Sequence, residues 1–166
     1  MPLSLQRRLT MTALLGLAWW FFDNLYEAVV FSPNWVQDSP AQMARLHQLF
    51  VTTSPTVYFV PATPLAVLML WGLWVSNRHA ALNTPYRRAS AWAAVSMLVN
   101  AFIVATIITR LFGPDALLHP DELNALCWRW NALNVVRMAA VAATAVAVFR
   151  IYLRLERLSD PGPAET

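Results

Sequence analysis

Lysine, cysteine and charge are scarce in this sequence. None of its twelve basic residues is a lysine, and Cys127 is its one cysteine, which excludes an internal disulfide and a CxxC redox pair. Charged residues make up 13% of the 166 residues, about half the share of a typical soluble domain, and hydrophobic residues make up 58%. So short and apolar a chain predicts a single domain in a membrane.

A net charge of +3 and a pI near 9.6 do not by themselves indicate nucleic-acid binding. The arginines are dispersed between apolar segments and form no single basic patch. We therefore expect the lipid bilayer as a partner and no nucleic acid. The apolar run behind Arg7 and Arg8 lacks a small-x-small cleavage site, so we expect a retained first helix instead of a signal peptide.

Four apolar segments are close to the roughly 20 residues that a membrane-spanning helix needs. They are residues 9–31, 57–75, 90–112 and 128–152. They predict an all-α fold, a four-transmembrane-helix bundle that forms one domain over residues 1–158. In the first outer loop, Ser39 as a cap and Pro40 at the first helical position predict a short amphipathic helix. The polar tail at residues 159–166 is expected to be disordered.

The placement of arginine predicts the orientation of this bundle. Most arginines fall on one side of the four-span arrangement: Arg7, Arg8, Arg78, Arg87, Arg88, Arg150, Arg154 and Arg157. The other side carries most of the acidic residues of the loops. By the positive-inside rule both termini are cytoplasmic, which predicts a multi-pass protein of the bacterial inner (cytoplasmic) membrane.

The first and last segments carry polar residues into the membrane at matching depths. Counting 1.5 Å per residue from the outer edge, Asp23 lies roughly 12 Å deep and Arg137 roughly 13 Å deep. The polar residues of each helix also share one face: Trp20, Asp23, Asn24 and Glu27 on the first, and Trp130, Asn131, Asn134 and Arg137 on the last. The two stripes are therefore expected to face each other inside the bundle.

The third segment adds Asn100 near the midplane and Arg110 near its outer end. Two bases, Arg110 and Arg137, could then balance the two acids of the first segment. Because each ionisable group inside a membrane costs about 2.5–3.5 kcal/mol or more, such groups usually mark a functional site. We expect a polar pocket in the outer half of the bundle that holds a small lipophilic or aromatic molecule.

A family resemblance rests on Asn100 and on the run WRWNALNVVRMAAVAA, Trp128–Ala143. A midplane Asn followed by a W-x-x-W-N-x-x-R-like stretch and an alanine-rich helix resembles the DUF1772, or anthrone-oxygenase-like, family of four-span membrane proteins. Trp130, Asn134 and Arg137 match this pattern, and the SPTVYFVPATPL stretch adds to it. Leu133 replaces the second Trp, and AFIVA follows Asn100 without the Pro and second Asn that the family often shows.

The resemblance implies a cofactor-independent oxygenase that converts anthrones to anthraquinones with molecular oxygen, without metal or flavin. Such chemistry needs a base, and a carboxylate shielded from water, Asp23 or Glu27, suits that role. Arg137 would hold the developing oxyanion, which makes these three residues the catalytic candidates. The substrate-binding candidates are Trp20, Asn24, Asn100, Arg110, Trp130, Asn131 and Asn134.

Two other functions fit the same residues. The pocket could serve a non-enzymatic binding or transport protein, although four helices are few for alternating access and a homo-oligomer or partner would be required. Alternatively, the chain could be an accessory membrane subunit whose ion pairs only fix helix register. His47 and His119 lie in outer loops without the spacing of a metal site, so no metal is expected.

Overall fold

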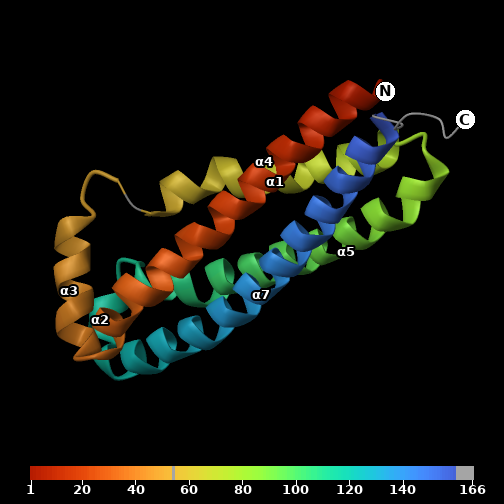
Figure 1. Cartoon of the computed structure of the whole chain (residues 1–166). Helices are drawn as coiled ribbons and strands as arrows, with labels where there is room; N and C mark the ends of the chain where they lie inside the picture. Colours follow the sequence, from red (N-terminus) through yellow and green to blue (C-terminus); the bar gives the residue numbers. More distant parts are fainter. Residues whose placement is uncertain (54, 160–166) are drawn as a thin grey trace, which may run out of the picture.

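The computed structural model describes residues 1–53 and 55–159, and only the backbone of residues 55, 56 and 59–62. All regular structure in this part of the chain is helical. Four helices form the body of the fold: α1 (Leu3–Tyr26), α4 (Pro55–Ser76), α5 (Ala80–Ile103) and α7 (Pro120–Ser159). They run up and down along one direction, with α7 packed against α1 and α5, and α4 packed against the same two helices (Figure 1). The all-α prediction is therefore confirmed.

Two of these helices continue beyond a wider, π-helical turn. After α1 come η1 (Glu27–Phe31) and α2 (Ser32–Val36), and after α5 come η2 (Val104–Ile108) and α6 (Thr109–Leu111). Pro33 lies in the first turn of α2, directly after the π-turn, and the rod continues past it.

Among the fully described residues, three helical rods are long and apolar enough to cross a membrane: Leu3–Val36, Ala80–Leu111 and Pro120–Ser159. The predicted segments at 9–31, 90–112 and 128–152 correspond to parts of them, and each rod is longer than predicted. The fourth predicted segment, 57–75, lies within α4, whose fully described part Thr63–Ser76 is an apolar helix. The polar tail was predicted to start at residue 159, but Ser159 still belongs to α7. Residues 160–166 lie outside the described part.

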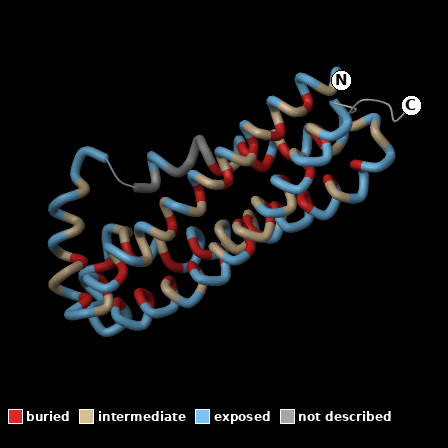
Figure 2. Tube along the Cα trace, viewed as in Figure 1, coloured by how far each residue is buried: buried red, intermediate tan, exposed pale blue. Residues whose placement is uncertain are grey.

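Apolar side chains cover the outside of the bundle as well as filling its core, unlike in a typical soluble protein. Large apolar residues such as Leu15, Phe22 and Leu98 are exposed, whereas amides, hydroxyls and one guanidinium are buried. Figure 2 shows the exposed residues along the outer sides of the rods and the buried ones between them. Because polar groups in hydrocarbon must find partners inside the protein, this arrangement suits a bundle surrounded by lipid.

The end of the bundle opposite the start of α1 is closed by α3 (Ser39–Leu49), which stands across the other helices (Figure 1). This is the amphipathic helix expected in the first loop. Met43 is fully buried, and the ring of His47 stacks on that of Phe112 with centroids 5.8 Å apart. The expected cap is wrong: the Ser39 hydroxyl donates to the Trp35 carbonyl at 2.7 Å, because α2 brings that free carbonyl within its reach.

The other end is held by a second polar cluster, which the sequence had not indicated. Gln6 Nε2 donates to Asn77 Oδ1 at 3.1 Å and to the Tyr86 hydroxyl at 3.3 Å. The hydroxyls of Thr10 and Tyr86 lie 2.8 Å apart. This cluster ties α1 to the start of α5 and to the turn before it, and so fixes the register in which the polar residues of the opposite half meet.

Candidate functional site

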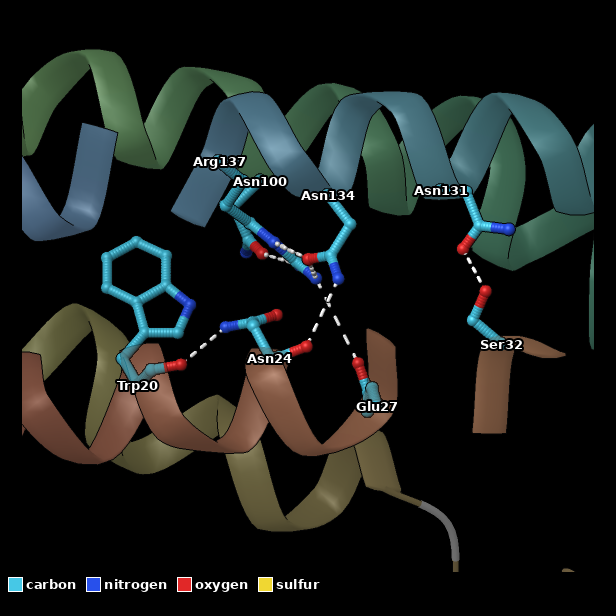
Figure 3. Close-up of polar contacts among 8 residues, drawn as sticks. All are labelled: Trp20, Asn24, Glu27, Ser32, Asn100, Asn131, Asn134 and Arg137. Atoms are coloured by element: carbon cyan, nitrogen blue, oxygen red, sulfur yellow. Dashed lines mark hydrogen bonds and ion pairs between the residues drawn. The ribbon is translucent and has the colours of Figure 1, made fainter. Parts of the chain in front are cut away.

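The guanidinium of Arg137 is the centre of a buried polar network. Its Nε and Nη2 donate to Asn134 Oδ1 at 3.1 and 2.6 Å, and its Nη1 donates to Asn100 Oδ1 at 2.7 Å (Figure 3). Asn134 lies three residues earlier on the same helix, so the two side chains share one face. Asn100 lies on α5, and its hydrogen bond with Arg137 links α5 to α7, the two helices that pack most extensively against each other.

Glu27 neutralises this guanidinium from α1. Its Oε2 lies 3.9 Å from Arg137 Nη2, within ion-pair distance but beyond a direct hydrogen bond. Both side chains are nearly removed from the surface, at 14% and 7% exposure. The carboxylate therefore balances the buried charge, while neutral amide oxygens set the position of the guanidinium.

Asn134 connects the network to the backbone of α1. Its Nδ2 donates to the Asn24 carbonyl at 3.2 Å, and Asn24 Nδ2 donates to the Trp20 carbonyl at 2.5 Å (Figure 3). The Asn24 amide is thus bonded within its own helix instead of pointing at a ligand. Trp20 is likewise part of the apolar core, where it packs and contributes its carbonyl.

A wide helical turn lies beside the network on each side. The turn η1 starts at Glu27, directly after Tyr26, and η2 begins four residues beyond Asn100. Such π-turns occur mostly as single insertions within α-helices and are frequent at functional sites. Here the first one carries the carboxylate itself, so the backbone that positions the acid departs from regular helix.

Aromatic rings close the outer side of the network. The Trp130 ring lies under the Arg137 guanidinium, 5.9 Å from its carbon, in a cation–π contact. Trp35 packs against Trp130 with ring centroids 4.7 Å apart. The Trp35 Nε1 is buried and finds no acceptor among the described residues, so a donor is left free beside the network.

Ser32 and Trp35 were not among the expected site residues. Ser32 donates its hydroxyl to Asn131 Oδ1, which turns that amide toward α2 and away from Arg137. The spacing gives a partial signal for Trp35: it follows Glu27 by eight residues, which in a regular α-helix would place both on one face. It was missed because the first segment was expected to end at residue 31.

Two expected members lie elsewhere. Asp23 is partly exposed and bonded to the side chain of Trp19, so the Arg137 pairing falls to Glu27 alone. Arg110 pairs with Glu122 at the exposed end of the bundle, which corrects the expectation that it balances a buried acid. The turn after α6 and η3 (Ala116–Leu118) brings Glu122 back beside Arg110.

The described residues contain no group of three His, Cys, Asp or Glu that could hold a metal ion. His47 instead makes a 2.9 Å hydrogen bond with the Leu111 carbonyl. The network itself offers one carboxylate, one guanidinium and three amides, which suits proton transfer and the holding of an anionic oxygen. Asn134, Asn24 and Trp35 are almost completely buried, and the carboxylate of Glu27 is the more exposed member of the ion pair.

The fold and the network together define a helical protein with three apolar rods of membrane-crossing length and a buried ion pair between two of them. Comparisons with models of protein families, with curated proteins and with solved structures find no match to this chain. The resemblance to the anthrone-oxygenase-like family thus remains an expectation based on its residues.

Proposed function

We propose that this protein spans the membrane four times with both termini in the cytoplasm. Its outer-half network then binds a small lipophilic molecule with an acidic C–H or O–H and promotes its oxygenation without a cofactor. One observation carries the proposal: a carboxylate and a guanidinium are buried between helices, neutral as a pair but not directly hydrogen-bonded. A carboxylate held in this way can accept a proton, and the guanidinium beside it can bind an oxyanion.

The step we propose begins when Glu27 accepts a proton from an activated CH₂ group of the substrate. The resulting enolate is stabilised at its oxygen by Arg137, whose Nη2 is the donor nearest the carboxylate. The enolate then transfers an electron to molecular oxygen, and recombination with return of the proton gives a hydroperoxide. Loss of water from this hydroperoxide leaves a ketone, so CH₂ and O₂ become C=O and H₂O.

Trp35 and Trp130 supply the binding surface in this proposal. Their rings pack against each other beside the guanidinium, and both are buried, so a flat substrate would stack on them by displacing part of this packing. The unpartnered Trp35 N–H would donate to a substrate oxygen and so recover a hydrogen bond that a buried donor otherwise lacks. The site therefore favours an aromatic ketone or phenol over an aliphatic lipid.

The test is oxygen consumption by the purified protein in lipid nanodiscs, with anthrone-type phenols as substrates. We expect Glu27→Gln to lower the rate about 100-fold or more, since general base catalysis typically contributes that much. Asp23→Asn is the matched control, because it removes a carboxylate one helical turn away and should leave the rate within twofold. Full activity of Glu27→Gln, or no uptake by the wild-type protein with any such substrate, would refute the proposal.

A second function is favoured by the near-complete burial of Asn134 and by the bonds that Arg137 makes to neighbouring amides. An accessory membrane subunit would use this network only to fix the register of α1, α5 and α7. In that case Glu27→Gln paired with Arg137→Gln should preserve the assembly and its function. The oxygenase requires that the same double variant be inactive even where it remains folded.

A further inference from the structure

A basic cleft lies between the start of α5 and the end of α7, at the end of the bundle where α1 begins. It has a volume of about 330 Å³, and three arginines line it: Arg88 from α5, and Arg150 and Arg154 from α7. Thr84 adds a hydroxyl, and Ala147 and Ile151 contribute small and apolar surface. The arginines thus converge from two helices on one hollow.

No acidic residue lines this cleft. Among the described residues, none of its three arginines makes an ion pair, and the nearby Glu156 instead accepts a hydrogen bond from Tyr152 at 2.7 Å. Arg150 and Arg154 lie four residues apart on one helix face, where like charges repel each other. An anion in the cleft would remove this repulsion.

The cleft is located where the apolar outer surface of the bundle meets its basic end. Trp92, one turn beyond Arg88, and Phe149, next to Arg150, are both exposed. On the same two helices, the next exposed residues toward the middle of the bundle, Val95 and Val146, are aliphatic. Exposed Trp residues such as Trp92 are enriched at the interface between hydrocarbon and headgroups. The three guanidinium groups are therefore at headgroup depth.

From this placement we infer that the cleft binds the phosphate of an anionic phospholipid. Guanidinium groups pair with phosphate oxygens through two parallel hydrogen bonds, and the Thr84 hydroxyl can donate a further one. Basic pockets between membrane helices are a recurring way to hold such headgroups. The acyl chains would lie along the exposed apolar faces of α5 and α7. This site is separate from the Glu27–Arg137 network and does not depend on its activity.

Native mass spectrometry of the detergent-purified protein tests this inference, with phosphatidylglycerol and phosphatidylcholine of identical acyl chains as ligands. We expect the wild-type protein to retain phosphatidylglycerol at least fivefold better. The triple variant Arg88→Gln, Arg150→Gln and Arg154→Gln should lose this preference. Inorganic phosphate at matched concentration should neither bind with comparable affinity nor release the lipid; if it does both, the ligand is a soluble anion and the inference is wrong.

The matched control removes three exposed arginines from the same end of the bundle that do not line the cleft: Arg8→Gln, Arg87→Gln and Arg157→Gln. It should keep the lipid preference within twofold. An equal loss in both triple variants would mean that only the overall charge matters and would overturn the inference. If the cleft triple does not fold, the neighbours Arg88→Gln and Arg87→Gln give the same comparison with one charge each.

Discussion

The carboxylate of Glu27 lies 3.9 Å from the guanidinium of Arg137, farther than the amide oxygens that accept hydrogen bonds from that guanidinium at 2.6–3.1 Å. The position of the guanidinium and the balance of its charge thus depend on different partners. The neutral amides fix the side chain, and the acid makes its burial tolerable. This division predicts unequal effects when the two charged residues are replaced.

Arg137→Gln should be the more destabilising change, lowering the free energy of unfolding by about 3–5 kcal/mol, because it leaves a buried carboxylate and two unsatisfied amide oxygens. Glu27→Gln also leaves a buried charge unpaired, but the guanidinium keeps its hydrogen bonds, so this change should cost less, about 2–3 kcal/mol. The double variant should cost less than the two single changes together. Reversible unfolding by SDS in mixed micelles measures all three values, and strict additivity would contradict a direct interaction.

Asn134 and Asn131 allow the network to be tested at two residues one helical turn apart. Asn134→Leu keeps a similar volume but removes the acceptor for two Arg137 bonds and a donor to α1, so we expect a loss of about 2–4 kcal/mol. Asn131→Leu removes only the bond from Ser32 and should cost about 0.5–1.5 kcal/mol. Equal losses in the same SDS assay would show that the hydrogen bonds of Asn134 to Arg137 and α1 contribute no more to stability than the single bond of Asn131.

Helical rise and helical face were enough to predict that the polar layers of the first and last segments meet. The structure shows this meeting in the Glu27–Arg137 pair and in the bond from Asn134 to α1. Which acid faces the arginine could not be predicted, because Asp23 and Glu27 are four residues apart and share a face in a regular helix. The π-turn that starts at Glu27 departs from that regular periodicity.

The partner of Arg110 could not be predicted for a related reason. Depth along a helix is a local property, but Glu122 reaches Arg110 only through the turn and the short η3 between α6 and α7. Periodicity carries no information about the geometry of such a turn. The sequence therefore predicted the rods and the buried layer but not the contacts made at the rod ends.

The Arg110–Glu122 pair should contribute little to stability. Both side chains are more than half exposed, at 54% and 51%, where water screens the attraction. We expect Glu122→Gln to change the free energy of unfolding by no more than about 0.5 kcal/mol, against the larger cost of Glu27→Gln. A loss above about 1.5 kcal/mol in the SDS assay would mean that this end of the bundle is shielded from water.

Gly16 and Gly72 make a final pair for which the packing predicts opposite signs. A methyl group at Gly16 of α1 would lie 3.0 Å from the Cβ of Ala66 on α4, which cannot rotate away, so the two helices would have to separate slightly. We expect Gly16→Ala to cost about 1–2 kcal/mol. At Gly72 nothing lies within 4 Å, and Gly72→Ala should stabilise the helix by about 0.4–1 kcal/mol.

Combining Gly16→Ala with Ala66→Gly should recover most of the stability lost in Gly16→Ala, as measured by SDS unfolding, because the pair then exchanges its methyl group across the same contact. A loss that persists in this double variant would show that the space at Gly16 is limited by something other than Ala66.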